Sequence, residues 1–351
     1  MSGEHSGETV RVWVDGCYDL FHFGHANAIR QARGLFAGPV AVVAGVCSDA
    51  SIAANKGPTA TPEAERYAAV AACRWVDEVA EDAPYETQLA AIDSYRCAWC
   101  VHGDDITTMA DGSDCYSEAK AAGRYKQFKR TQGVSTTELV GRILKMSDVQ
   151  GPPVSSVSTF VATASRIAQF SSAREPAPSD RIVYVHGQFD LFHIGHIEFL
   201  KAARSRGDFL VVGIHDDATT NHIMGSTFPV MNLHERVLSV LQCRYVDDVI
   251  IGAPYKISDH VLTKAYKVDV VCHLRDAPSP LDVNGLDPYQ IPKERGIFQE
   301  IDAPNSTMTT QTIISRILGQ RQVYEARNAR KLQKGVIEQE LLKKESIRER
   351  K

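Results

Sequence analysis

The sequence predicts an α/β protein that consists of two tandem domains with parallel sheets, followed by a helical C-terminal tail. The first observation is an internal repeat, because VWVDGCYDLFHFGHANAIRQAR at 12–33 returns as VYVHGQFDLFHIGHIEFLKAAR at 183–204. The second is that later segments return in the same order, at a spacing of about 170 residues. An ordered repeat of this length indicates a duplicated domain.

The later pairs of repeated segments differ in how closely the two copies match. The stretch ERYAAVAACRWVDEVAEDAPY at 65–85 pairs closely with ERVLSVLQCRYVDDVIIGAPY at 235–255. CVHGDD at 100–105 pairs loosely with VCHLRD at 271–276, and STTELVGRIL at 135–144 pairs loosely with TMTTQTIISRIL at 307–318. The two copies therefore share a fold and differ in detail.

Each copy alternates apolar runs with helical patterns. VAVVAGVCSD at 40–49 and FLVVGIHDD at 209–217 are continuous apolar runs that end in Asp. Such runs suit strands that are buried on both faces of a parallel sheet. Because helical stretches alternate with them, we expect each copy to form a doubly wound sheet.

Composition shifts set the expected boundaries of the chain's parts. We expect the first domain at 9–147 and the second at 181–319, with a partly ordered linker at 148–180 that is rich in Ser and Pro. The tail at 320–351 is charged and helix-prone, with few apolar positions. A helix lying on a membrane surface is one interpretation of the tail, and a solvated helix is the favoured one.

Composition also excludes several classes of protein. The chain has 351 residues, an apolar fraction of 44% and a net charge of −4, which gives no argument for nucleic-acid binding. The polar first ten residues resemble no signal or transit peptide, and no run is long enough to span a bilayer. Eight cysteines in a chain of this length favour reduced thiols. We therefore expect a cytoplasmic protein.

The turn after the first strand carries the candidate chemistry. In DGCYDLFHFGHANAI, His22 and His25 lie where a strand gives way to a helix. Ligands of doubly wound sheets bind at such strand ends, where a helix N-terminus attracts anions. Residues at i and i+3 share a helical face, and Gly24 allows a phosphate to come close. The pattern predicts a phosphate site.

Two other interpretations of these histidines stay open at this point. A single His is usually a packed or solvated side chain. Zinc would need at least a third ligand, for which Cys97, Cys100 and His102 are the nearby candidates. The phosphate interpretation is favoured because the H-x-G-H pattern recurs at the same place in the second copy, so no metal ligand is assigned.

The motifs resemble those of a known family. H-x-G-H after a D-x-x-x-D-L-F turn, NKGP at 55–58, RWVDEV at 74–79, HGDD at 102–105 and RTQGVSTT at 130–137 resemble, in this order, the cytidylyltransferases. The resemblance implies Rossmann-like nucleotidyltransferase domains. Two such domains in one chain resemble the branch that acts on phosphoethanolamine, whereas the choline and glycerol relatives carry one domain per chain.

The resemblance also implies roles for residues of the first copy. A phosphomonoester would attack the α-phosphorus of CTP, which carries Mg²⁺, and the catalytic groups would be His22, His25, Lys56 and Arg130. The implied nucleotide contacts are Gly16, Cys17, Tyr18, Gly24, His102, Asp104, Asp105, Ser135, Thr136 and Thr137. The implied contacts to the phosphoalcohol are Asp19, Asp49 and Arg66.

The second copy lacks two of the cations. The position of Lys56 falls at or near Met224, and the stretch IDAPNSTMTT has no counterpart of Arg130. We therefore expect a poor catalyst that retains at most nucleotide contacts, at Gln188, Phe189, His193, His196, His273, Thr309 and Thr310. The alternative functions are a cytidylyltransferase that acts on phosphocholine or another phosphoalcohol, and a non-catalytic nucleotide sensor. By analogy, WVDEV at 75–79 and YVDDV at 245–249 could form an internal pseudo-dimer, and a homodimer is a further expectation.

Overall fold

The computed structural model describes residues 9–105, 107–109, 113–146, 158, 160–225, 227–275, 277–278, 285 and 287–331. The chain divides into two compact units, of which the first comprises Met1–Ala71, Trp75–Ser147 and Ile314–Lys351 and the second comprises Ala72–Arg74 and Asp148–Ile313. The predicted linker residues 148–157 and 159 and tail residues 332–351 lie outside the described residues.

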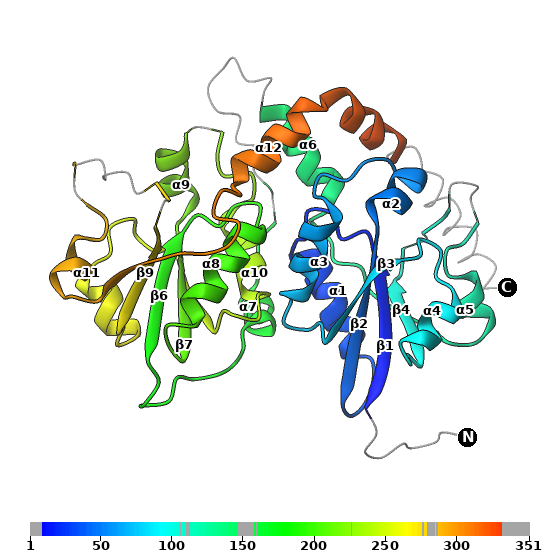
Figure 1. Cartoon of the computed structure of the whole chain (residues 1–351), viewed down its shortest axis with the longest axis horizontal. Coiled ribbons are helices and arrows are strands. Elements are labelled where there is room, and N and C mark those ends of the chain that lie inside the picture. Colours follow the sequence, from blue (N-terminus) through cyan, green and yellow to red (C-terminus); the bar gives the residue numbers. More distant parts are fainter. Residues whose placement is uncertain are drawn as a thin grey trace. The chain divides into compact units, whose positions relative to one another are not determined.

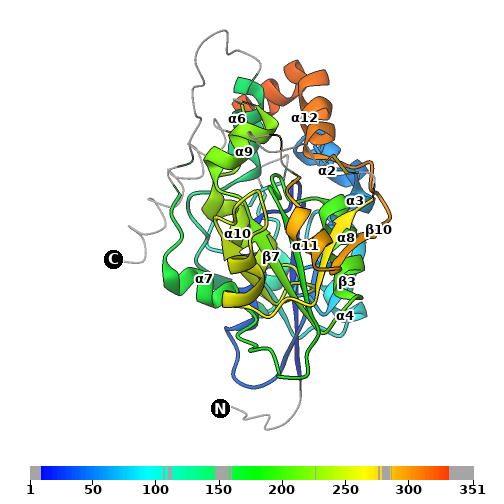
Figure 2. The ribbon, with the colours of Figure 1, turned by 90° about the vertical axis from the view of Figure 1, so that its left-hand side faces the viewer.

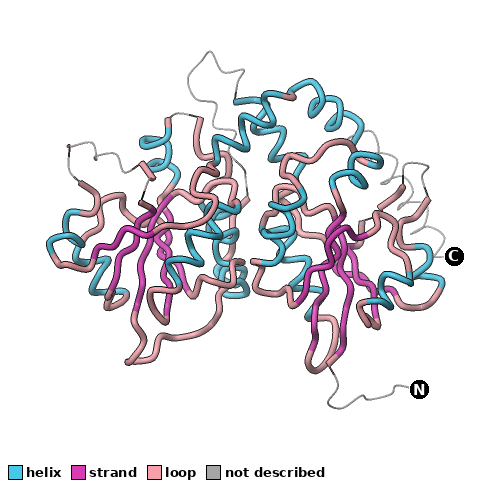
Figure 3. The backbone as a smooth tube through the Cα atoms, in the orientation of Figure 1, coloured by secondary structure: helices cyan, strands magenta, loops and turns pink. Residues whose placement is uncertain are grey.

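The described part of the first unit contains a five-stranded parallel sheet of order β3-β2-β1-β4-β5 (Figures 1 and 3). Its strands are β1 (Val10–Gly16), β2 (Val40–Cys47), β3 (Glu78–Ala83), β4 (Trp99–Gly103) and β5 (Tyr125–Phe128). The chain moves outward from β1 to β3 and then crosses to β4 on the other side of β1. This reversal creates a topological switch point between β1 and β4, where α/β proteins bind ligands.

Helices cover both faces of this sheet. They are α1 (Phe23–Arg33), α2 (Asp49–Asn55), α3 (Glu63–Ala71), α4 (Leu89–Ser94), α5 (Ser117–Ala121) and α6 (Thr136–Met146). In Figure 1, α1 and α3 lie on one face of the sheet and α4 and α5 on the other. Right-handed crossovers require this arrangement, since the direction of travel across the sheet reverses after β3.

Burial explains the composition of the central strands. In β2 all residues but Ala41 are buried, as expected for a strand covered on both faces. Trp13 on β1 packs over Gly45 on β2, where a Cβ atom would come within 2.3 Å of the indole ring. Tyr184 and Gly213 repeat this pairing of a large aromatic side chain with a glycine in the second unit. The duplicated domains therefore share a packing device that differs only in the aromatic residue.

The second unit has the same topology, with the strand order β10-β9-β6-β7-β8 in its described part. Its strands are β6 (Ile182–Gly187), β7 (Phe209–Ile214), β8 (Asp248–Ile251), β9 (Val270–Leu274) and β10 (Phe298–Ile301). Its helices are α7 (Ala164–Phe170), α8 (Ile194–Arg204), α9 (Asp217–Met224), α10 (Leu233–Leu241), the short π-helix η1 (Val261–Ala265), α11 (Gln290–Glu294) and α12 (Thr310–Gly319). The predicted pair of parallel α/β domains is confirmed.

Part of the expected linker is helical. Figures 1 and 2 show α7 beside α10, and its residue Phe170 is fully buried. Asn232, which caps the start of α10, donates through its side-chain amide to the Phe160 carbonyl oxygen at 2.9 Å. This stretch of the linker therefore packs onto the second unit.

The unit boundaries differ from the predicted domain boundaries at two places. Residues Ala72–Arg74 belong to the second unit, where Cys73 and Cys243 form an isolated antiparallel bridge. The chain from Ile314 onward belongs to the first unit, and residues 321–331 continue as a helix after α12. Within the part of the chain that the structure describes, no helix has the length and hydropathy to cross a bilayer.

Candidate functional site

The first turn of α1 presents two stacked imidazoles at the end of β1. His22 is the N-cap residue, and its Nδ1 accepts a hydrogen bond from the backbone N–H of Gly24 at 3.1 Å. The Nδ1 of His25 accepts from the backbone N–H of His22 at 3.3 Å, and the two ring centroids are 3.9 Å apart. A Cβ atom on Gly24 would come within 2.8 Å of the His22 ring, so only glycine fits between cap and helix.

These contacts fix which nitrogen of each neutral ring carries the proton. Because each Nδ1 accepts a backbone N–H, a neutral ring must carry its proton on Nε2. Burial, followed by the charge of Arg130, lowers the pKa of His25 to about 3, and burial lowers the pKa of His22 well below its usual value. At neutral pH both rings are therefore uncharged, and each has an Nε2–H donor for an oxyanion.

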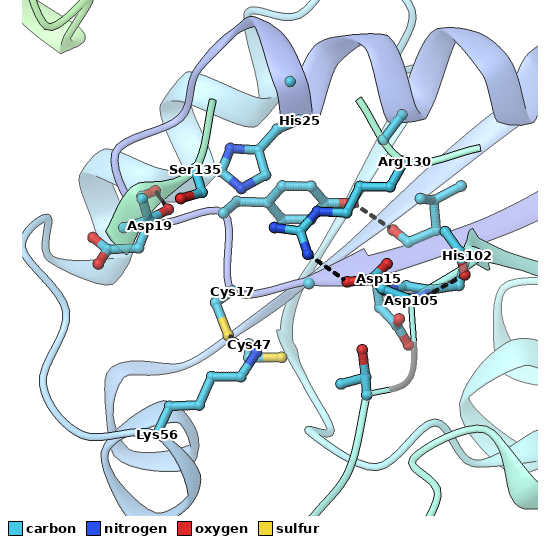
Figure 4. Close-up of a pocket in the computed structure, with 18 of the residues that line it drawn as sticks. Asp15, Cys17, Asp19, His25, Cys47, Lys56, His102, Asp105, Arg130 and Ser135 are labelled. Carbon is cyan, nitrogen blue, oxygen red and sulfur yellow. Dashed lines mark hydrogen bonds and ion pairs between the residues drawn. The ribbon is translucent and has the colours of Figure 1, made fainter. Parts of the chain in front are cut away.

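The imidazoles face a cavity of ≈ 220 Å³ at the switch point of the sheet. Figure 4 shows His25, Lys56 and Arg130 directed toward the same space from three different segments. The predicted site residues that line the cavity are Gly16, Cys17, Tyr18, Asp19, His22, Gly24, His25, Lys56, His102, Asp105, Arg130, Ser135 and Thr136. The predicted residues Asp49, Arg66, Asp104 and Thr137 are not among those that line it.

The two predicted phosphate cations reach the cavity from separate loops. Lys56 follows the last residue of α2, and its Nζ lies 3.6 Å from Cys17 Sγ and 5.3 Å from the centre of the Tyr85 ring. Arg130 lies just beyond β5, where its Nη1 donates to Asp105 Oδ2 at 3.1 Å and its backbone N–H donates to Asp104 Oδ1 at 2.9 Å. Asp104 thus holds the arginine backbone while Asp105 orients the guanidinium group.

The start of α6 also lines the cavity, through Ser135 and Thr136. Ser135 caps this helix, because its Oγ accepts from the backbone N–H of Glu138 at 3.1 Å. The hydroxyl of Thr136 donates to the Asp19 carbonyl oxygen at 2.8 Å, which ties the start of α6 to the turn after β1. A helix N-terminus at this place adds N–H donors and positive partial charge to the cavity.

The turn between β1 and α1 is strained. Tyr18 and Leu20 have φ angles of 52° and 47°, in the left-handed region that non-glycine residues rarely adopt. The equivalent residues Phe189 and Leu191 have φ angles of 52° and 45°. The same costly geometry in both copies indicates that the surrounding contacts enforce it, as at many functional sites.

The two carboxylates predicted to contact the phosphoalcohol are already engaged with protein groups. Asp19 Oδ1 accepts from the backbone N–H groups of Ala60 and Thr61 at 2.9 and 3.0 Å. Asp49 Oδ1 accepts from the Thr59 hydroxyl at 2.9 Å and also from the Arg66 guanidinium group. Asp19 therefore ties the loop after Lys56 to the β1 turn, and direct contact of either carboxylate with substrate stays a prediction.

Arg66 is only 1% exposed and occupies the base of the same region. It donates to the carbonyl oxygens of Thr61 at 3.2 Å, Cys17 at 2.7 Å and Cys47 at 2.7 Å, and to Asp49 Oδ1 at 2.9 Å. Arg236 makes the equivalent set of four contacts in the second unit, with the acceptors Met231, Gln188, His215 and Asp217. Arg66 therefore fixes the loops around the cavity, and a contact of Arg66 with the substrate stays a prediction.

We expect Arg66→Ala to lower the free energy of unfolding of the first unit by about 3 kcal/mol, because it leaves buried carbonyl groups without donors. Chemical denaturation followed by fluorescence would measure the change, with Arg236→Ala as the matched variant in the second unit. If Arg66→Ala kept wild-type stability and raised only the KM for the phosphoalcohol, the predicted substrate contact would be right instead.

Several cavity residues were missed by the sequence analysis. Asp15, the last residue but one of β1, is buried and accepts hydrogen bonds from Trp13 Nε1 at 2.8 Å, from the Tyr116 hydroxyl at 2.9 Å and from the Thr87 hydroxyl. The sequence signal that could have identified Asp15 is the difference between VDG at 14–16 in the first copy and VHG at 185–187 in the second. Arg327 and Lys331, from the tail, also line the cavity, and no local pattern marked them.

The zinc interpretation has no support in the geometry. Cys97 and Cys100 are buried thiols, and burial raises the pKa of each above its usual value. Among the residues that the structure describes, no group of three or more His, Cys, Asp and Glu side chains is arranged to hold a metal ion.

Comparison with known proteins identifies the family of the chain. A family model described as cytidylyltransferase-like matches residues 13–142 and 184–302, which is more than half of the chain. The chain belongs to the cytidylyltransferase-like family. Both family matches contain an H-x-G-H segment, so both units are cytidylyltransferase-like domains.

Two relatives named ethanolamine-phosphate cytidylyltransferase match over nearly their whole length. An ethanolamine-phosphate cytidylyltransferase of Dictyostelium discoideum is 48% identical, over 94% of this chain and 97% of the relative. The enzyme of that name from Mus musculus is 45% identical, over 94% of this chain and 91% of the relative. By contrast, choline-phosphate cytidylyltransferase 2 of Arabidopsis thaliana is 41% identical over only 40% of this chain and 46% of the relative.

The second cytidylyltransferase-like domain keeps the frame of the site. The centroids of His193 and His196 are 3.8 Å apart, and the hydroxyl of Thr310 donates to the Asp190 carbonyl oxygen at 2.8 Å, as Thr136 does to Asp19. The further residues predicted to contact nucleotide lie on matching elements: Gln188 and Phe189 follow β6, His273 is on β9, and Thr309 precedes α12.

The second domain lacks counterparts of the cations Lys56 and Arg130. Met224, which is 41% exposed, ends α9 near the place that Lys56 has at the end of α2. Ala303 lies two residues beyond β10, as Arg130 lies two residues beyond β5. Nucleotide binding by the second domain stays a prediction.

Proposed function

We infer that this chain is an ethanolamine-phosphate cytidylyltransferase, which transfers CMP from CTP to phosphoethanolamine and releases CDP-ethanolamine and pyrophosphate. The single observation that carries the proposal is the convergence of His22, His25, Lys56 and Arg130 on one cavity. The full-length match to ethanolamine-phosphate enzymes, against a partial match to a choline-phosphate enzyme, favours the ethanolamine substrate. The reaction is a step in phosphatidylethanolamine synthesis.

The reaction requires two anions to meet. A phosphate oxygen of phosphoethanolamine forms a bond to the α-phosphorus of CTP, while the bond from that phosphorus to the bridging oxygen of the β-phosphate breaks. The pyrophosphate leaves with the electron pair of that bond. The protein has little covalent work to do, so positioning and neutralisation of charge account for catalysis.

The cavity residues suit these tasks. In this proposal the Nε2–H groups of His22 and His25 donate to the α-phosphate, where negative charge accumulates in the transition state, since each Nδ1 is already occupied. Lys56 and Arg130 line the same cavity, and we propose that their ammonium and guanidinium groups bind the phosphates that depart as pyrophosphate. The start of α6 adds backbone donors beside Ser135 and Thr136.

Mg²⁺ is proposed to arrive with CTP. Asp15 and Asp105 are cavity carboxylates, but the first accepts from Tyr116 and Trp13 and the second from Arg130. Mg²⁺ in nucleotide sites is held mainly by phosphate oxygens and water, with few protein ligands, and the donor set fits that arrangement. The metal would neutralise phosphate charge.

The remaining expectations belong to the proposal as well. The ammonium of the substrate would need an acceptor near the β1 turn, for which Asp19 and Asp49 stay candidates. We propose a cytoplasmic enzyme with no nucleic-acid partner. The internal pseudo-dimer, a homodimer and a weak contact of the tail with membrane surfaces remain expectations from the sequence.

A panel of phosphoalcohols tests the assignment. We expect pyrophosphate release from CTP with phosphoethanolamine to exceed that with phosphocholine by at least about tenfold in kcat/KM, because the sites must distinguish a primary from a quaternary ammonium. Preference for phosphocholine would place the chain in the choline branch. An absence of turnover with every phosphoalcohol would favour a non-catalytic nucleotide sensor.

A further inference from the structure

The helical residues 321–331, called the tail helix below, pack on the loops of the first unit's cavity. Tyr324 is 2% exposed, and its hydroxyl donates to the carbonyl oxygen of Thr59 at 2.8 Å. Just before the tail helix, Arg316 on α12 donates to both carboxylate oxygens of Glu65 on α3, each at 2.8 Å. In Figure 1 the tail helix is the orange to red segment that follows α12.

Arg327 connects the tail helix with the loop that follows Lys56. Its Nη1 lies 3.1 Å from Asp19 Oδ2 and donates to the carbonyl oxygen of Pro58 at 2.6 Å. The Arg327 side chain is 11% exposed, so this ion pair is largely shielded from water. The same carboxylate holds the backbone N–H groups of residues 60 and 61 through its other oxygen. Arg327 therefore locks the loop that carries Lys56.

Lys331 lies one helical turn beyond Arg327, on the same face of the tail helix, and it lines the same cavity. The side-chain amide of Asn328 donates to the carbonyl oxygen of Thr137 at 3.3 Å, which anchors this turn to the start of α6. Although the residue as a whole is exposed, the positive charges of three other side chains act on its ammonium group.

The charges around Lys331 indicate what the cavity is built to receive. Loss of hydration, followed by repulsion from Lys56, Arg130 and Arg327, lowers the pKa of Lys331 to about 8. Like charges that face one small space are unfavourable until an anion enters. A triphosphate is an anion of sufficient charge, whereas the carboxylates of Asp19 and Asp105 are each already paired with an arginine.

We propose that the tail helix completes the nucleotide site of the first unit, with Lys331 as a phosphate-binding residue and Arg327 as a positioning residue. The inference rests on the proposed function, because it names further residues of the same site. It assigns to the tail helix a role in substrate binding that the composition of this segment did not suggest.

Two single substitutions on neighbouring residues test the role of Lys331. Lys331→Ala and Arg330→Ala each remove one positive charge from the tail helix, but only Lys331 lines the cavity. We expect Lys331→Ala to lower kcat/KM for CTP by roughly 10- to 100-fold, as loss of one charge-assisted phosphate contact does. Arg330→Ala should stay within about twofold, and Lys331→Arg should recover most of the loss.

The readouts are pyrophosphate release and CTP binding by calorimetry, both with the full-length chain. Equal kinetics of Lys331→Ala and Arg330→Ala would overturn the inference, and so would faster turnover of Lys331→Ala, which would indicate an obstructing tail. For Arg327, we expect Arg327→Met to lower kcat more than Arg327→Lys, because Met leaves the buried carboxylate of Asp19 unpaired. Equal kcat values for the two variants would overturn the positioning role of Arg327. If the wild-type chain itself turned over no phosphoalcohol, the proposed function would fail, while CTP binding would still report on Lys331.

Discussion

Replacing His25 by alanine is expected to lower the turnover of CTP by about 100- to 1,000-fold, the usual loss when one oxyanion donor is removed. In the proposed reaction the His25 ring donates to the α-phosphate through Nε2, because its Nδ1 already accepts from the backbone N–H of His22 at 3.3 Å. His196→Ala, the same change in the second unit, is expected to leave the rate within about threefold, because the cations that would act with it are absent there.

The two variants are matched in structure, so a difference between them reports on chemistry. His196 Nδ1 accepts from the His193 backbone at 3.4 Å, and burial lowers the pKa of both His25 and His196 to about 3. Each substitution therefore removes an equivalent capping contact, His25→Ala at the start of α1 and His196→Ala at the start of α8. Pyrophosphate release at saturating CTP and phosphoethanolamine provides the measurement. Equal loss of turnover in the two variants would disprove the division of labour between the units.

The equivalence of the histidines locates the functional difference between the units in their loops. Both units keep the strained turn, the stacked rings and the threonine contact to the turn. The second lacks an equivalent of Lys56, and Ala303 stands at the place of Arg130. Because the frame survives without the cations, its geometry depends on packing and backbone contacts, and the cations add charge to a frame that is already set.

The sequence predicted the frame because its signals are local and repeated. Apolar runs, the H-x-G-H turn and the partner segments each identify an element by pattern alone, and duplication supplies an internal check. The roles of Lys56 and Arg130 came from the family resemblance, and the structure brings both side chains to the cavity. Their convergence follows from parallel strands, whose carboxyl ends meet at one edge of the sheet.

What the sequence could not predict depends on contacts between distant segments. Arg66 was expected to contact the substrate, and only the three-dimensional structure shows its donors directed at carbonyl groups. Lys331 stands in a charged stretch that resembles a solvated helix, since a single turn of contacts gives no periodic apolar signal. Asp15 was marked only by a difference between the copies, whose meaning required the positions of Trp13 and Tyr116.

Replacing Lys56 by alanine is expected to lower kcat/KM for CTP by about 100-fold or more, because its ammonium lines the cavity and is one of two loop cations proposed to neutralise the departing phosphates. Lys56→Arg should recover little of this, since Nζ lies 3.6 Å from Cys17 Sγ beside the Tyr85 ring, where a planar guanidinium group meets a differently shaped space. Steady-state pyrophosphate release with varied CTP measures both effects.

Lys129→Ala is the matched control, because Lys129 precedes Arg130 in the same unit, is exposed and is not among the residues that line the cavity. Both substitutions lower the net charge by one, so a change in the long-range field would affect them alike, and only a local phosphate contact separates them. If Lys56→Ala turned over CTP as fast as Lys129→Ala, the neutralisation would have to come from Arg130, the tail helix and the metal carried by the nucleotide, and the loop after α2 would serve only to close the cavity.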